Sequence, residues 1–197
     1  GFLTLWMLLS VPVLLCGCAR QDAAMQQALD FRAALLQSGG CQFQAAVTAD
    51  YGEQIFEFTL DCAYTPENGA KMTVVAPESI AGITAVVTPG GASIEYDGAS
   101  FALGKLAGGH LAPMALPELL GRCWCSEYIL AAGTSQDGWR LTCVSGYDSD
   151  ELRVDTWLDD AGQPEYCEIS YDGQMLLRAE LTAFQLGQAT EELHENT

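Results

Sequence analysis

Basic residues are scarce in this chain. Only 8 of its 197 residues are Lys or Arg, against 26 Asp and Glu, and the formal net charge is −18. Nucleic-acid binding depends on clustered cations that meet the phosphates, so a nucleic-acid partner is excluded. Anionic lipid headgroups repel the same charge, so a protein of this composition needs a covalent tether to stay at a membrane. An excess of acid also keeps an exported domain soluble.

Residues that build hydrolytic centres are almost as rare. The two histidines are His110, in a glycine-rich stretch, and His194, in the acidic C-terminal segment, and the sequence has no Gly-x-Ser-x-Gly motif. A serine or cysteine nucleophile needs a base beside it. The sequence therefore predicts a protein that is not an enzyme and that carries no cofactor.

Metal and redox motifs are also lacking. Cys123-Trp124-Cys125 has one residue between its thiols, a spacing tighter than that of structural zinc sites and of thioredoxin-like motifs. The acidic clusters at 148–151 and 159–160 do not follow the loop pattern of calcium sites. Both clusters fall between expected strands, where solvated acids are common. No metal site is predicted.

Charge is absent from the chain before Arg20, where an apolar run stands instead. Residues 3–15 have the length of the centre of a secretory signal. The run ends in Leu15-Cys16-Gly17-Cys18, which resembles the lipobox of bacterial lipoproteins, whose cysteine receives diacylglycerol. We expect residues 1–17 to be a lipoprotein signal peptide and Cys18 to be lipidated, so that the domain is extracytoplasmic and anchored to the cell membrane. The alternative is an uncleaved anchor helix, since the run is nearly long enough to span a bilayer.

Six further cysteines belong to the expected mature domain. An even number outside the cytoplasm is typical of disulfides, unless the compartment keeps the thiols reduced. Elimination and strand alternation favour disulfides from Cys123 and Cys125 to Cys143 and Cys167. These six are Cys41, Cys62, Cys123, Cys125, Cys143 and Cys167.

The segment 41–64 has the alternation of a β-hairpin. If Tyr51-Gly52 is a two-residue loop, Phe43 lies opposite Leu60 and the apolar residues share one face. The same register places Cys41 opposite Cys62. Directly opposed residues at a non-hydrogen-bonded site are close enough for a disulfide, so we predict a Cys41–Cys62 bridge.

Strand patterns fill most of the remaining sequence. An amphipathic helix is expected over 22–38, stopped by Gly39-Gly40, and a short helix over 117–120. With so little helix, the sheet must curl to bury its apolar face. The sequence predicts a mainly β (α+β) fold, a curved antiparallel half-open β-barrel of about 10–11 strands with an N-terminal helix and a short helical plug, followed by an acidic mobile tail at 187–197. The further strands are expected at 71–76, 83–88, 92–96, 99–104, 127–133, 138–146, 151–159, 165–171 and 175–185.

Several local patterns follow one another in a known order. The opening helix leads to the Phe-rich hairpin at 41–64, then to a strand ending in a proline at 71–78, a strand and turn at 94–98, and closing strands from Thr156-Trp157-Leu158-Asp159 to Phe184. This order resembles the LolA/LolB superfamily of lipoprotein carriers and its Gram-positive lipoprotein relatives, over residues 22–186.

The resemblance implies a LolA-like half-barrel domain at 18–186, an incomplete antiparallel barrel capped by helices around an apolar cavity for acyl chains, with no chemical reaction. Strand alternation selects the residues that would line such a cavity, and the same residues could equally form an ordinary packed core. They are Phe43, Phe56, Phe58, Leu60, Leu141, Val154 and Ile169.

The expected function is therefore that of a membrane-anchored extracytoplasmic lipoprotein that binds a hydrophobic ligand, a lipid or acyl chain, without catalysis. The alternative is a regulatory protein-interaction lipoprotein with the same fold, like the germination lipoproteins that bind a cell-wall amidase. A large dry cavity would favour the ligand. A large exposed apolar patch on the convex side would favour an extracytoplasmic protein partner.

Overall fold

The computed structural model describes residues 12–52, 54–88, 91–96, 99–103, 106–107, 110–126, 128–135, 138–145 and 152–187. Eleven antiparallel strands form one sheet, in the order β6-β5-β4-β3-β2-β1-β13-β12-β11-β10-β9, and β7 pairs with β8 separately. The strands are β1 Cys41–Asp50, β2 Ile55–Thr65, β3 Gly69–Ala76, β4 Thr84–Thr88, β5 Gly91–Tyr96, β6 Ala99–Leu103, β7 Leu106–Ala107, β8 His110–Leu111, β9 Ala131–Ser135, β10 Gly138–Ser145, β11 Leu152–Leu158, β12 Pro164–Tyr171 and β13 Gln174–Leu186.

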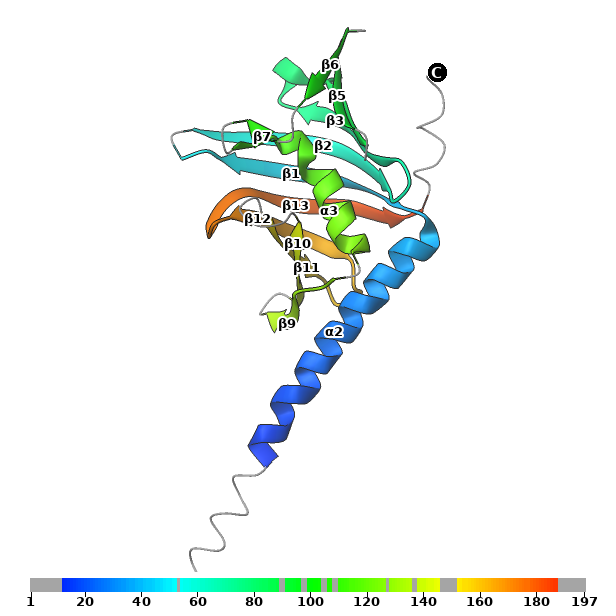
Figure 1. The fold of residues 1–197 in the computed structure, drawn as a ribbon, viewed down its shortest axis with the longest axis vertical. Coiled ribbons are helices and arrows are strands. Elements are labelled where there is room, and N and C mark those ends of the chain that lie inside the picture. Colours follow the sequence, from blue (N-terminus) through cyan, green and yellow to red (C-terminus); the bar gives the residue numbers. More distant parts are fainter. Residues whose placement is uncertain are drawn as a thin grey trace, which may run out of the picture.

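The sheet is curved and open, as the sequence predicts. Strands β6 and β9 are its two ends, and β1 at its centre pairs with both β2 and β13. The expected helical plug is α3, Leu116–Cys125, which is longer than the expected segment. It lies across one face of the sheet and contacts β2, β3, β10 and β11 (Figure 1). The half-open barrel with its plug is thus confirmed.

The N-terminal helix α2, Pro12–Ser38, begins at Pro12 rather than at residue 22. Gly17 alone interrupts a run of helix-compatible residues there, and a single glycine is tolerated inside a helix. The helix ends as expected, with Gly39 at φ +77° and the Ser38 hydroxyl donating to the Leu35 carbonyl at 2.9 Å.

In the described part of the chain, no helix combines the length and the apolar character that a bilayer span requires. Residues 1–11 of the expected signal peptide lie outside the described residues, as do residues 188–197 of the expected tail. The signal peptide, the domain boundary and the tail stay predictions.

The register of the first hairpin differs from the predicted one. Asp50 accepts a hydrogen bond from the Gly52 amide at 2.8 Å, and the loop takes up positions 51 to 54 instead of two residues. The longer loop moves the pairing by two residues, so Phe43 lies opposite Cys62, and Cys41 lies opposite Tyr64. Because a shift of two keeps each side chain on its face, the apolar face was predicted correctly. The direct opposition of Cys41 and Cys62 was wrong.

The last hairpin also has a different loop. Asp172 and Gly173, with φ of +48° and +78°, form a two-residue turn in place of the expected three-residue one, and both residues adopt the left-handed conformation that such turns need. A register shift between Ile169 and Ser170 compensates, so Ile169 lies opposite Leu177 and both stay on one face of the sheet.

Helix α3 packs so closely on the sheet that Gly121 leaves no room for a larger side chain. A Cβ at Gly121 would overlap Cγ of Tyr64, whose ring is buried on β2. Overpacking of this kind costs about 1 to 3 kcal/mol. We expect Gly121→Ala to lower the free energy of unfolding by this amount in urea denaturation. Gly133→Ala is the matched control, because a Cβ there meets nothing within 4 Å. Equal unfolding midpoints for the two variants would contradict this packing.

Candidate functional site: the groove beside helix α2

Most of the residues expected to line a cavity are packed instead. Phe43, Leu60, Leu141, Val154 and Ile169 are at most 3% exposed. They belong to one hydrophobic cluster with Leu116, Leu120 and Trp124 of α3. Side chains of the plug therefore fill the concave face at these positions.

The other two predicted lining residues lie toward the tip of the first hairpin. Phe56 is 40% exposed and Phe58 is half-buried. Their ring centroids are 6.3 Å apart, and Tyr51 lies 5.8 Å from Phe56. Phe56 and Phe58 are thus more exposed than the five packed residues. Together with Tyr51 they form a row of aromatic rings toward the tip of the hairpin.

Four aromatic rings hold α2, α3 and the centre of the sheet together. Trp124 of α3 lies 5.6 Å from both Phe31 of α2 and Phe43 of β1, and 6.0 Å from Phe184 of β13, between ring centroids. The buried Trp124 indole donates to the Thr156 hydroxyl at 3.0 Å. This ring cluster (Phe31, Phe43, Trp124 and Phe184) fixes the position of both helices.

A groove opens on the outer side of this ring cluster, between α2, the turn at 159–163 and the end of β13. Its volume is about 600 Å³, and its apolar lining residues are Phe31, which is 6% exposed, Ala34, Ala161, Phe184 and Leu186. Three amides, Gln27, Gln163 and Gln185, supply polar groups, together with the carboxylate of Asp30. A groove of this size with apolar walls and a few polar groups is typical of small-molecule sites.

Phe31 and Phe184 of this groove are not among the residues predicted to line a cavity. Phe31 lies on the expected apolar face of the helix and could have been found there. Phe184 could not, because strict alternation from Ala179 and Leu181 turns it outward. A bulge between the Gln42 and Gln44 pairings, with Ala183 at φ +52°, reverses the alternation and brings Phe184 to the ring cluster.

The six cysteines of the described domain are free thiols. Burial, with a smaller contribution from the Asp155 carboxylate, raises the pKa of Cys143 to about 11, and burial raises the pKa of Cys167 to about 12. The thiol of Cys143 donates to the Cys123 carbonyl at 3.3 Å. A raised pKa disfavours the reactive thiolate, so these thiols act as small core residues. The predicted Cys41–Cys62 bridge depended on a register that the structure does not have, and both cysteines are free thiols.

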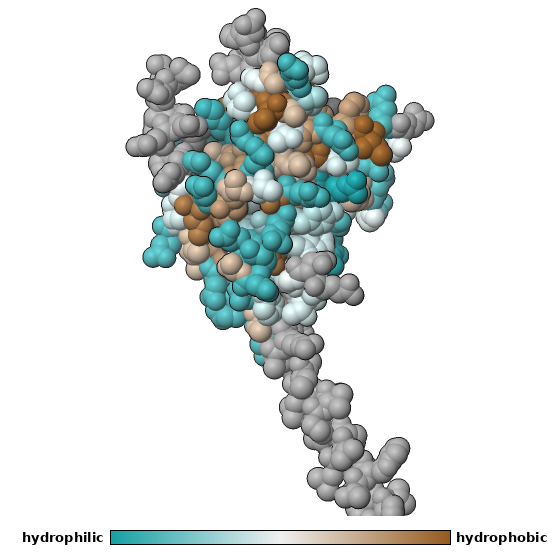
Figure 2. Space-filling view, turned by 180° about the vertical axis from the view of Figure 1, so that it is seen from behind, coloured by the Kyte–Doolittle hydropathy of each residue, from teal (hydrophilic) through white to brown (hydrophobic). Residues whose placement is uncertain are grey.

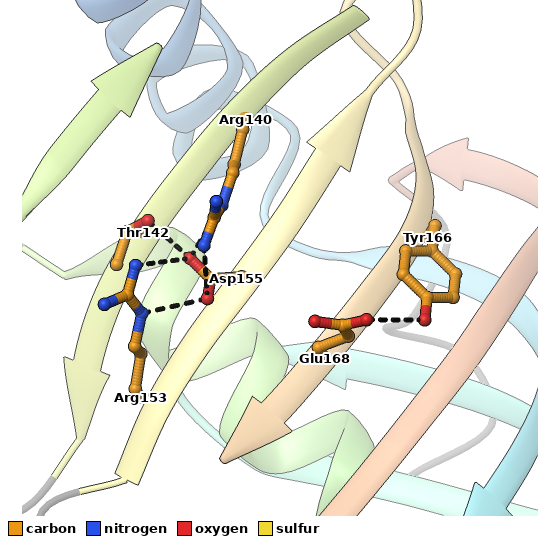
Figure 3. A network of polar contacts seen from close by, with 6 residues as sticks. All are labelled: Arg140, Thr142, Arg153, Asp155, Tyr166 and Glu168. Atoms are coloured by element: carbon orange, nitrogen blue, oxygen red, sulfur yellow. Dashed lines mark hydrogen bonds and ion pairs between the residues drawn. The ribbon is translucent and has the colours of Figure 1, made fainter. Parts of the chain in front are cut away.

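The opposite, outer face of the sheet carries a polar network on β10 and β11. The buried Asp155 carboxylate accepts hydrogen bonds from Arg140 at 3.1 Å, Arg153 at 2.9 Å and the Thr142 hydroxyl (Figure 3). Arg140 also lies 5.1 Å above the Trp157 ring. Burial raises the pKa of Asp155, but the three hydrogen bonds outweigh burial and hold this pKa below its usual range.

Because of this network, we expect the stability of the fold to depend on pH. The pKa of Asp155 is lower in the folded than in the unfolded chain, so its contribution to stability is complete above about pH 5 and is lost as the pH falls below about 4. We expect Asp155→Asn to cost about 1 to 3 kcal/mol of unfolding free energy at pH 7, and the difference from wild type to shrink toward pH 3 in urea titrations. Asp160→Asn, at an exposed turn position, should change little at either pH. A cost for Asp155→Asn that is independent of pH would refute the charge argument.

No family model matches this chain, and no curated protein matches it either. Among solved structures it is similar to the LolA superfamily protein NE2245 from Nitrosomonas europaea, at 9% identity over 84% of this chain and 94% of that one, with a TM-score of 0.48. An outer membrane lipoprotein-sorting protein domain from Vibrio parahaemolyticus is 9% identical over 87% and 95%, with a TM-score of 0.46. LprF from Mycobacterium bovis is 14% identical over 85% and 97%, with a TM-score of 0.39.

The solved structures similar to this chain thus include the superfamily that its sequence resembles. These likenesses concern the fold. What the domain binds has to be inferred from its own residues.

Proposed function

We propose that this protein is a membrane-anchored extracytoplasmic lipoprotein that binds a hydrophobic ligand, a lipid or acyl chain, in the groove beside α2 and catalyses no reaction. The observation that supports this proposal is the aromatic wall of the groove, formed by Phe31 and Phe184 over the rest of the ring cluster. An acyl chain on these rings leaves water at a gain of about 0.8 kcal/mol per buried CH₂.

The polar groups of the groove favour an uncharged head on this ligand. Gln27, Gln163 and Gln185 offer amide donors to an ester or hydroxyl group. Asp30, which accepts a hydrogen bond from Gln26 at 2.7 Å, stands at the same groove and repels a free carboxylate. A neutral glycerolipid therefore fits better than a fatty-acid anion.

The position of the groove on α2 suits a ligand taken from the membrane. Gln27 lies nine residues after Cys18 on the same helix, which is about 14 Å along the helix axis. A lipidated Cys18 would hold the groove close to the bilayer surface. Two acyl chains are enough for stable anchoring.

The chemistry of the described site supports binding rather than catalysis. The polar side chains of the groove are amides and one carboxylate. The buried thiols have raised pKa values, and Asp155 is held in ion pairs on the other face. None of these groups is an activated nucleophile.

Filling the groove tests the ligand proposal. Ala34 lines the groove, whereas Ala33 next to it on α2 is exposed. We expect the domain 21–197 to bind one dioctanoylglycerol in native mass spectrometry, Ala34→Phe to weaken this binding at least tenfold, and Ala33→Phe to bind like wild type. The first described helix side chain in the core is Ala24, so this domain keeps the described core. Equal binding by both variants, or none by wild type, would rule out the groove as the lipid site.

The anchor has its own test. We expect Cys18→Ser to abolish metabolic labelling with a radioactive fatty acid, because Cys18 is the residue expected to carry diacylglycerol. Cys16→Ser is the matched control, two residues away in the expected signal peptide, and should be labelled and fractionate with membranes. Unchanged labelling of Cys18→Ser would place the lipid on another residue, and absence of labelling in the wild-type protein would refute the lipoprotein assignment and favour the uncleaved anchor helix.

Binding of an extracytoplasmic protein partner is the second candidate function. The filled concave face favours it, because a packed plug leaves the outer surfaces of the sheet as the larger area for contact. Lipid binding beside α2 and partner binding on the sheet use different residues, and one does not require the other.

A further inference from the structure

The outer face of the sheet holds a second groove, with a volume of about 780 Å³. It crosses the central strand β1 and its neighbours, on the side that the two helices leave uncovered (Figure 2). In this view apolar residues are interspersed with hydrophilic ones and form no single broad patch. The floor consists of small side chains, Ala46 and Thr48 on β1, Thr59 on β2 and Ala76 on β3, so another chain can approach the sheet closely here.

Two carboxylates stand on either side of this floor. Glu57 of β2 lies opposite Thr48, and Glu180 of β13 lies opposite Ala46, and both glutamates are exposed. The strands that carry them are separated by β1, and the two pairings are offset by two residues along β1, which puts the two side chains roughly 12 Å apart across the groove. The groove therefore presents two negative charges at a defined spacing.

One cation, Arg178, also lines the groove. Arg178 of β13 lies opposite Glu168 of β12 in the sheet. Glu168 also accepts a hydrogen bond from the Tyr166 hydroxyl at 2.8 Å (Figure 3). With Glu57, Glu180 and Arg178 in its lining, the groove carries one net negative charge, and Glu168 beside Arg178 adds a further carboxylate next to it.

We propose that this groove binds an extended basic segment of a partner protein, with two cationic side chains placed over Glu57 and Glu180. In an extended segment, residues four positions apart project from the same side and are separated by roughly 13 Å, which is close to the spacing of the two carboxylates. Small residues between the two cations fit the floor of alanines and threonines. The half-buried Tyr166 ring lines the groove and offers an aromatic face to a cation.

The charge of the whole domain points to the same kind of partner. A net charge of −18 repels acidic partners and attracts basic ones at long range. Three of the eight basic residues, Arg140, Arg153 and Arg178, lie on the outer face of β10–β13, and each is beside a carboxylate. These cations do not reverse the acidic character of the groove.

The test compares variants of equal net charge. A rhodamine-labelled peptide with the motif Lys-Ala-Ala-Ala-Lys is titrated with the domain 21–197, and binding is followed by fluorescence anisotropy. We expect Glu57→Gln with Glu180→Gln to weaken binding at least tenfold at low salt. Glu67→Gln with Asp160→Asn removes the same charge at exposed positions outside the groove, and should change affinity less than twofold. Equal weakening by both double variants, or no binding by wild type, would overturn the proposal.

Two further measurements separate a groove from general attraction of cations. Ala46→Tyr fills the floor without changing the charge, and we expect it to abolish peptide binding while its thermal unfolding midpoint stays within a few degrees of wild type. Spermidine, a free polyamine, should displace the peptide only at concentrations at least tenfold above those of unlabelled peptide. Unchanged binding by Ala46→Tyr, or spermidine competing as well as the peptide, would overturn a protein segment as the occupant.

Discussion

The packing of Trp124 against Phe31, Phe43 and Phe184 is the interaction on which the rest of this structure depends. An open sheet of eleven strands cannot bury its concave face by closing on itself, so other elements must cover it. The ring cluster does this by joining α2 and α3 to β1 and β13, and the indole hydrogen bond to Thr156 leaves the buried Trp124 nitrogen satisfied. The packed core and the apolar wall of the groove beside α2 both follow from this one contact.

The small number of cations determines the charge of the surface. Arg140 and Arg153 share Asp155, Arg178 lies beside Glu168, and Arg32 donates to the Ser126 carbonyl at 3.0 Å. With so few cations, and several of them engaged within the fold, most carboxylates keep their charge toward solvent. The domain thus combines a groove with aromatic and amide side chains beside α2 with an acidic outer sheet. These two surfaces suit ligands of opposite character, a lipid chain and a basic polypeptide.

Sequence reasoning succeeded where one local rule governs the structure. Alternation placed Phe43, Leu60, Leu141, Val154 and Ile169 correctly on the inner face, and glycine chemistry located the end of α2. It failed where the conformation of one residue changed the length of a loop or added a residue to a strand. The hydrogen bond from the Gly52 amide to Asp50 moved the first hairpin by two residues, and the bulge at Ala183 turned Phe184 inward. Neither effect has a periodic signal, because each depends on the conformation of one residue.

The sequence by itself determined the class of fold, the strands, the inner set of apolar residues and the acidic surface, since each follows from periodicity or composition. The tertiary structure alone decided whether the concave face was hollow or filled, where the thiols lie relative to one another and where grooves remain. Alternation states which side chains face inward, but it does not state what meets them. That depends on the docking of α2 and α3 against strands distant in the chain, and only the folded arrangement of those elements contains it.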